Sequence, residues 1–154
     1  MAPPRGGPHR GGATPWRNTA LRLARLPGWG RPLDHAVRAE LSRAFKTQMP
    51  HPFPEAVTNV LAELSRERRP DISLIAIDWL RQQTKCKVNT YHFNAVISAH
   101  ARVTEWTQAL ALMDAMAEED AECDSTTFNT AMAACDRGGK WELALRLLRR
   151  MAEA

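Results

Sequence analysis

The sequence predicts an all-α protein, an α-solenoid of antiparallel helix hairpins with about two clear 35-residue repeats and a degenerate one. Residues 90–118 and 125–153 carry one pattern at a constant offset, which Phe93 and Phe128 set at 35 residues. Within each copy, apolar residues recur at i, i+3, i+4 and i+7, the spacing of one helix face, in two successive stripes. A fixed period in this range is typical of stacked supersecondary units.

The two copies agree along their whole length. Identical residues at this offset are Asn94 and Asn129, Ala99 and Ala134, Arg102 and Arg137, Trp106 and Trp141, Leu110 and Leu145, Leu112 and Leu147, and Met116 and Met151. Between the two stripes, Gly138 and Gly139 are expected to end a helix in the second copy, and Thr104 is expected to cap one in the first. Each copy is therefore a helix hairpin, and the two units span residues 90–124 and 125–154.

Residues 1–33 contain six arginines and no acidic residue. This composition is typical of a mitochondrial or plastid transit peptide, and no continuous apolar run is present for a secretory signal. Two alternatives are a disordered basic tail and, from Arg5-Gly6-Gly7 and Arg10-Gly11-Gly12, a short RNA tether. A helix over residues 16–26 would be only loosely amphipathic, because its arginines do not lie opposite its leucines.

Residues 34–54 are expected to form a helix and a proline-rich linker. Asp34 is a candidate N-cap for a helix that runs to about Lys46, and the prolines at positions 50, 52 and 54 end it. Residues 55–89 are interpreted as a degenerate hairpin, with helices over about 55–66 and 72–83. Its apolar residues imply a register slip of about two residues against the strict period.

Charge is distributed unevenly along the chain. The formal net charge of +4 divides into +6 for residues 1–33, +2 for residues 34–87 and −4 for residues 88–154. Phosphate neutralisation supplies much of the affinity of proteins for nucleic acids. Any RNA binding by the acidic repeats must therefore depend on contacts with bases.

No chemistry of catalysis is indicated. Cys86, Cys123 and Cys135 have spacings that fit neither a disulfide framework nor a zinc site. Cys135 occupies the helix-face position of His100, and both are interpreted as packing residues. The H-x-E and C-x-x-C elements of a zinc deaminase, a Gly-rich phosphate loop and a G-x-S-x-G motif are all missing from the sequence. We expect no enzyme, no cofactor, no metal site and, without a run of 18 apolar residues, no membrane span.

A 35-residue hairpin that starts with an aromatic residue and Asn, carries Trp-x-x-Ala-Leu at its centre and closes with Met resembles the pentatricopeptide repeat family. The tetratricopeptide family differs in its period of about 34 and in its Trp, Leu-Gly and Tyr residues early in the first helix. The resemblance implies binding of single-stranded organellar RNA, about one base per repeat, in RNA processing, stability or translation. Mitochondria are the expected location, and plastids are the alternative.

In this family, the base is read by the polar residue after the first-helix aromatic and by the last residue of the repeat. The RNA-binding residues that the resemblance implies are Asn94, Asp124, Asn129, Asn89, Tyr91 and Thr126. Asn94 and Asp124 form the complete pair, and an Asn with a closing Asp implies uracil. Asn94 lies about 100° around the helix from Phe93, at the edge of the core stripe. Tyr91 and Thr126 would flank the base, and Tyr91 offers a stacking face.

In the other repeats the pair is incomplete or uncertain. Asn129 has no partner within the second clear repeat, and Asn89 closes the degenerate repeat with Asn59 as a weaker candidate for its partner. Asp124 and Asn89 are also well placed as N-caps of the helices that follow them. Arg102 and Arg137 stand at first-helix ends, where a cation favours the helix dipole, and phosphate contact is their second interpretation.

A protein-interaction scaffold built on the same hairpins is the alternative function, because the clear repeats are few and acidic. Leu147, Leu148 and Met151 are expected to lie on a helix face that no later helix covers. Exposed apolar surface of this kind favours association with a partner. The main expectation is that the sequence is a short or truncated piece of a longer array, in which a further helix would cover this face. Self-association, or contact with other proteins, is the alternative.

Overall fold

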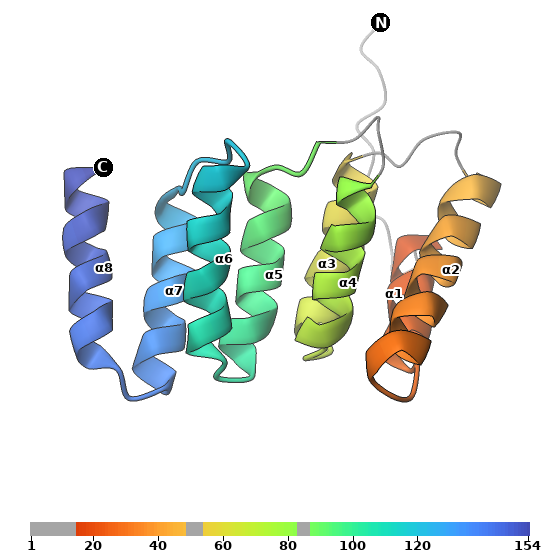
Figure 1. The fold of residues 1–154 in the computed structure, drawn as a ribbon, viewed down its shortest axis with the longest axis horizontal. Coiled ribbons are helices and arrows are strands. Elements are labelled where there is room, and N and C mark those ends of the chain that lie inside the picture. Colours follow the sequence, from red (N-terminus) through yellow and green to blue (C-terminus); the bar gives the residue numbers. More distant parts are fainter. Residues whose placement is uncertain (1–14, 49–53, 83–86) are drawn as a thin grey trace, which may run out of the picture.

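The computed structural model describes residues 15–48, 54–82 and 87–154, and throughout these ranges the protein is built from helices alone. In chain order the helices are α1 (Pro15–Ala24), α2 (Gly30–Gln48), α3 (Pro54–Arg66), α4 (Pro70–Arg81), α5 (Thr90–Arg102), α6 (Trp106–Glu118), α7 (Ser125–Arg137) and α8 (Trp141–Glu153). They form antiparallel hairpins that stack side by side (Figure 1). The predicted α-solenoid is confirmed.

The first helices of the hairpins form a continuous row. α1 packs on α3, α3 on α5 and α5 on α7, while each second helix packs on its own hairpin partner. α4 and α6 also reach forward to α5 and α7. Fully buried side chains such as Leu61, Phe93 and Ile97 fill the space between the rows, so the core runs along the whole array.

The N-terminal hairpin differs from the expectation for residues 1–33. Trp16, Thr19, Ala20 and Leu23 lie at i, i+3, i+4 and i+7 of α1, and the last three are completely buried. Trp16 stacks on Phe45 of α2 with ring centroids 5.6 Å apart. The buried stripe includes Thr and Ala, so a search for opposed leucines and arginines did not detect it. Residues 15–33 are thus an ordered part of the solenoid, whereas both Arg-Gly-Gly elements lie outside the described residues.

The start of α2 also differs from the expectation. The helix begins at Gly30, and a proline at position 32 is tolerated because the first turn donates no intrahelical hydrogen bond. Asp34 therefore lies inside the helix, and its carboxylate accepts hydrogen bonds from Arg38 Nε at 2.9 and 3.1 Å instead of capping. α2 ends at Gln48, and the linker residues 49–53 lie outside the described range.

The second hairpin has a smaller register slip than expected. α3 and α5 begin at residues 54 and 90, and α4 and α6 begin at residues 70 and 106, so both pairs are 36 residues apart. The buried residues Ser73, Ala76, Ile77 and Leu80 match Ala109, Leu112, Met113 and Met116 at this offset. The slip is therefore one residue rather than about two, and the additional residue lies between α4 and α5.

Three hairpin turns share one backbone conformation. Arg68, Thr104 and Gly139 have φ values of 55°, 65° and 68°, in the left-handed region. The expectation that Thr104 caps α6 is wrong, because the N-cap is Glu105 and it makes no side-chain capping bond. Thr104 instead occupies the turn position that Gly139 fills one repeat later.

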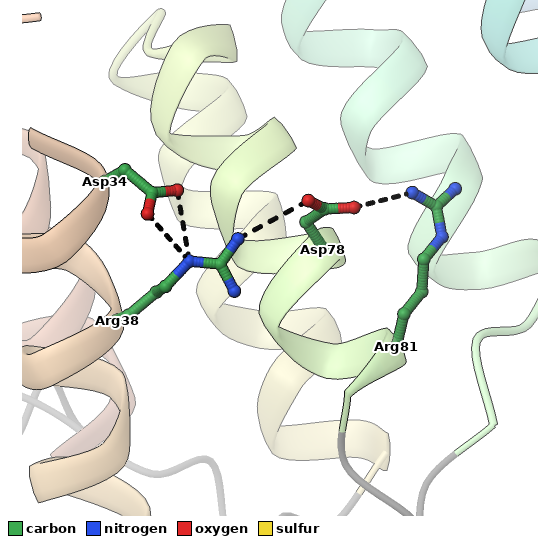
Figure 2. A network of polar contacts seen from close by, with 4 residues as sticks. All are labelled: Asp34, Arg38, Asp78 and Arg81. Carbon is green, nitrogen blue, oxygen red and sulfur yellow. Dashed lines mark hydrogen bonds and ion pairs between the residues drawn. The ribbon is translucent and has the colours of Figure 1, made fainter. Parts of the chain in front are cut away.

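An ion-pair ladder, defined as Asp34, Arg38, Asp78, Arg81 and Glu119, connects the second helices. Figure 2 shows its first four members across α2 and α4. Arg38 Nη2 lies 3.4 Å from Asp78 Oδ2, and Arg81 Nη1 lies 3.0 Å from Asp78 Oδ1. Arg81 also pairs with Glu119, just after α6. The second helices are therefore joined by charge as well as by apolar contacts such as the stacking of Phe45 on Trp79.

Candidate nucleic-acid interface

The junction between the third and fourth hairpins brings Asn94 and Asp124 together. Asn94 lies in the first half of α5, half-buried, and Asp124 is the N-cap of α7. Asn94 Nδ2 donates to Asp124 Oδ1 at 3.1 Å. The two residues that the family resemblance pairs are therefore in direct contact, because α7 packs on α5 with its N-terminus beside the first turns of α5.

Thr127 completes this junction, and the sequence analysis did not single it out. Its buried hydroxyl Oγ1 lies 2.6 Å from Asn94 Oδ1 and donates to it. Thr127 N donates to Asp124 Oδ1 at 2.9 Å, and Asp124 N donates to Thr127 Oγ1 at 3.2 Å, which makes a capping box. The sequence could have pointed to Thr127 through its spacing from Asp124, because a capping box joins the N-cap to the third helical residue.

These hydrogen bonds set the charge state of the junction. Partial burial alone would raise the pKa of the Asp124 carboxyl, but hydrogen bonds from Thr127 and Asn94 to the charged form outweigh it. The net pKa of Asp124 lies below its usual value of 3.8. The carboxylate is thus a fixed anionic acceptor at neutral pH.

Asn89 has the equivalent place before α5. Its side chain accepts from His92 N at 3.1 Å, and His92 Nδ1 accepts from Asn89 N at 3.1 Å. The capping role considered for both Asn89 and Asp124 is confirmed. The side chain of Asn89 is half-buried, and His92 is completely buried.

The remaining predicted residues of the clear repeats are exposed. Tyr91 has 70% of its surface exposed, and Thr126 and Asn129 are also open to solvent. Asn129 lines a shallow groove of about 310 Å³ between α5 and α7, together with Arg102 and Arg137. Arg137 Nη1 donates to the carbonyl of Ala101 at 3.0 Å, which supports the interpretation that this cation stabilises a helix C-terminus.

In the second hairpin, the 36-residue offset between α3 and α5 moves the counterpart of Asn94 by one residue from the expected position. Val57 is buried at the position of Phe93, so Thr58 rather than Asn59 corresponds to Asn94. Asn59 is exposed and lines a separate groove of about 410 Å³ between α1 and α3, beside Trp16 and Arg17. The buried spacing of Val57, Val60, Leu61 and Leu64 was the sequence signal for the correct register.

Two further observations concern membrane-spanning helices and metal-binding groups. None of the described helices is long and apolar enough to cross a membrane. Across the described ranges, no group of three or more His, Cys, Asp or Glu side chains is arranged to hold a metal ion. Cys135 and His100 are buried in the helix packing, whereas Cys86 lies outside the described residues.

The stacking of antiparallel helix hairpins places the protein in the class of helical-repeat proteins. Within that class, the family model for pentatricopeptide repeat-containing proteins matches residues 55–154. The chain belongs to the pentatricopeptide repeat family, whose members typically bind RNA. A search of curated proteins finds no match.

Proposed function

We propose that the protein binds single-stranded RNA, about one base per repeat, and acts without chemistry of its own in the processing, stability or translation of organellar transcripts. The observation that carries this proposal is the contact between Asn94 and Asp124 at the junction of two hairpins. An asparagine amide has two donor hydrogens and two acceptor lone pairs. Asp124 accepts one of the donor hydrogens of Asn94, and Thr127 donates to one of its acceptor lone pairs. One donor hydrogen and one acceptor lone pair therefore remain for the edge of a base.

Surrounding side chains support recognition of an unpaired base. Tyr91 stands in the first turn of α5 with its ring exposed, and an aromatic face stacks on any base. Arg102 lines the groove beside Asn129 and offers a cation to the RNA backbone. Because residues 88–154 carry a net charge of −4, few phosphates are neutralised, and affinity should depend only weakly on salt.

The test is binding of the full chain to oligo-U and oligo-A with Asn94→Ala. Loss of the Asn94 contacts should weaken binding to oligo-U by roughly 1–3 kcal/mol. The free energy of unfolding should change less, because the buried Thr127 hydroxyl keeps Asp124 Oδ1 as an acceptor at 2.9 Å. Thr107→Ala serves as a control, because Thr107 is exposed on α6, outside both the junction and the groove. Equal binding of both oligonucleotides, or a loss that follows unfolding, would argue against base reading.

We also propose a mitochondrial location, with plastids as the alternative. The support is the composition of residues 1–33, which hold six arginines and no acidic residue. α1 is packed in the folded protein, so recognition by an import receptor would precede folding. Residues 1–40 fused to a fluorescent reporter should enter mitochondria, and a diffuse cytosolic or nuclear signal would contradict this location.

A protein-interaction scaffold is the second candidate, and α8 carries the observation that favours it. Trp141, Leu145 and Leu148 are 64%, 56% and 52% exposed along one side of this helix. Of the three residues expected to be uncovered, Leu148 is exposed, whereas Leu147 is buried and Met151 is half-buried. Light scattering of the chain and of Leu145→Glu tests this candidate: a monodisperse monomer at high concentration would argue against it.

A further inference from the structure

The hydroxyl of Thr127 is the least expected member of the junction between α5 and α7. Its side chain is completely buried and cannot itself contact RNA, yet it lies 2.6 Å from the amide oxygen of Asn94. We infer that Thr127 is a positioning residue that fixes the orientation of the Asn94 amide and thereby lets the site distinguish uracil from cytosine. The inference rests on the proposed RNA binding.

The direction of each hydrogen bond follows from the partners. Thr127 Oγ1 accepts from Asp124 N at 3.2 Å, so its own proton needs an acceptor. Asp124 Oδ1, at 2.9 Å, already accepts from Thr127 N and from Asn94 Nδ2. Asn94 Oδ1 is closer, at 2.6 Å, and it is the acceptor with free lone pairs.

Two partners therefore specify one orientation of the Asn94 amide. Asp124, charged at neutral pH, requires the NH₂ group on its side. Thr127 requires the carbonyl oxygen on the other. A flipped amide would place its oxygen against the Asp124 carboxylate and its NH₂ group against the Thr127 hydroxyl, whose proton would have to turn from Asn94 Oδ1 to Asp124 Oδ1.

The orientation matters because uracil and cytosine are related by exchange of donor and acceptor. Uracil presents an acceptor at O4 beside a donor at N3, whereas cytosine presents a donor at N4 beside an acceptor at N3. An amide that flips freely satisfies both edges by exchanging its own N–H and C=O. An amide held in one orientation satisfies only one of them, so Thr127 acts on selectivity more than on affinity.

The inference is tested with the full chain and with oligo-U and oligo-C of equal length. Thr127→Val keeps the shape of the side chain and removes the hydroxyl, while Thr127→Ser keeps the hydroxyl. Thr130→Val is the matched control on the same helix, because its hydroxyl bonds to Thr126 O at 2.8 Å and not to Asn94. Should Thr127→Val fail to fold, Thr127→Cys, with a weak donor of similar size, replaces it.

Wild type should prefer oligo-U, and Thr127→Val should reduce the ratio of the two dissociation constants by about two- to tenfold. Thr127→Ser and Thr130→Val should retain the wild-type ratio. If wild type prefers oligo-U and Thr127→Val keeps the same ratio of dissociation constants, the inference is overturned while the proposed function stands. A wild type that binds both oligonucleotides equally, or neither, overturns the proposed function with it.

The amide orientation is also measurable without RNA. In the free protein, the NMR signals of the Nδ2 hydrogens of Asn94 should show slow exchange with solvent in wild type and Thr127→Ser, because one of these hydrogens is bonded to Asp124 Oδ1. In Thr127→Val these signals should broaden or exchange faster with solvent. Unchanged Asn94 signals in Thr127→Val would overturn the positioning role, whatever the RNA measurements show.

Discussion

The hairpins α5–α6 and α7–α8 repeat one pattern of residues, but their second helices have different surroundings. The ring of Trp106 lies against the Gly138 turn of the next hairpin, and Lys140 Nζ is 5.4 Å from its centroid. Trp141, at the same position one repeat later, is 64% exposed. Met113 is buried, while its counterpart Leu148 is 52% exposed.

Whether a residue of this fold is buried therefore depends on the contact between two neighbouring hairpins. Equivalent residues are core or surface according to whether another hairpin packs on them, as expected for a stack with nearest-neighbour coupling. Equivalent substitutions in the two hairpins should therefore have unequal effects. Four measurements test this expectation.

The largest effect is expected from Phe93→Ala. Phe93 is completely buried between neighbouring first helices, so its removal should cost about 3–5 kcal/mol of folding free energy through the cavity that it leaves. Phe128→Ala should cost less, because Phe128 lies in the last hairpin and is slightly exposed. Urea unfolding of both variants checks the order, and equal losses would contradict the pairwise account.

The next effect is expected from Gly138→Ala. The φ of Gly138 is −78°, so alanine causes no backbone strain there, but its Cβ would overlap Cδ1 of Trp106. Displacing this ring should destabilise the protein by about 1–3 kcal/mol. Trp106→Leu in the same background should recover part of the loss. If Gly138→Ala melts at the wild-type temperature, the Trp106 contact does not couple the hairpins.

A smaller, opposite effect is expected from Thr104→Gly. Thr104 is a β-branched residue at φ 65°, where Gly139 in the other hairpin has φ 68°. Removing this strain should offset the added chain entropy and stabilise the protein by up to about 1 kcal/mol. Gly139→Thr should destabilise by a similar amount. Thermal melts of the two reciprocal variants are the measurement, and shifts of the same sign would contradict the shared turn geometry.

The smallest effect distinguishes the two capping boxes. Asp124 has a lowered pKa in the folded protein, so its contribution to stability is present above the ordinary pKa and is lost as pH falls through the lowered one. Asn89 caps the other hairpin without charge. Asp124→Asn keeps a good N-cap and should flatten the loss of stability that sets in as the pH falls below the ordinary aspartate pKa of 3.8. Identical pH profiles for the two proteins would contradict a role for the carboxylate charge.

The sequence was sufficient for the fold wherever large apolar residues mark the repeat. Phe93 and Phe128 locate two hairpins, and the pairing of Asn94 with Asp124 places them at one junction. The N-terminal hairpin was missed because Thr19 and Ala20 are small or polar yet buried, while its arginines suggested a leader. One additional residue after α4 changed the predicted counterpart of Asn94 in α3, which is Thr58 in the structure and was Asn59 in the prediction.

The contribution of Thr127 depends on distances between hairpins. Its capping partner is three residues away, a spacing visible in the sequence, but its contact with Asn94 spans 33 residues. The packing of α7 on α5 creates that contact. A periodic pattern predicts which residues face a neighbour, whereas it does not specify which polar atoms then meet.

The ion-pair ladder from Asp34 to Glu119 adds a salt-sensitive connection between the second helices, of which α2 and α4 also share the stacking of Phe45 on Trp79. Interdigitated apolar side chains between the first helices resist sliding and separation steeply. Charge pairs such as Arg38 with Asp78 vary slowly with distance and weaken as salt rises. Rising ionic strength is therefore expected to loosen the contacts between the second helices before it affects the apolar packing of the first helices.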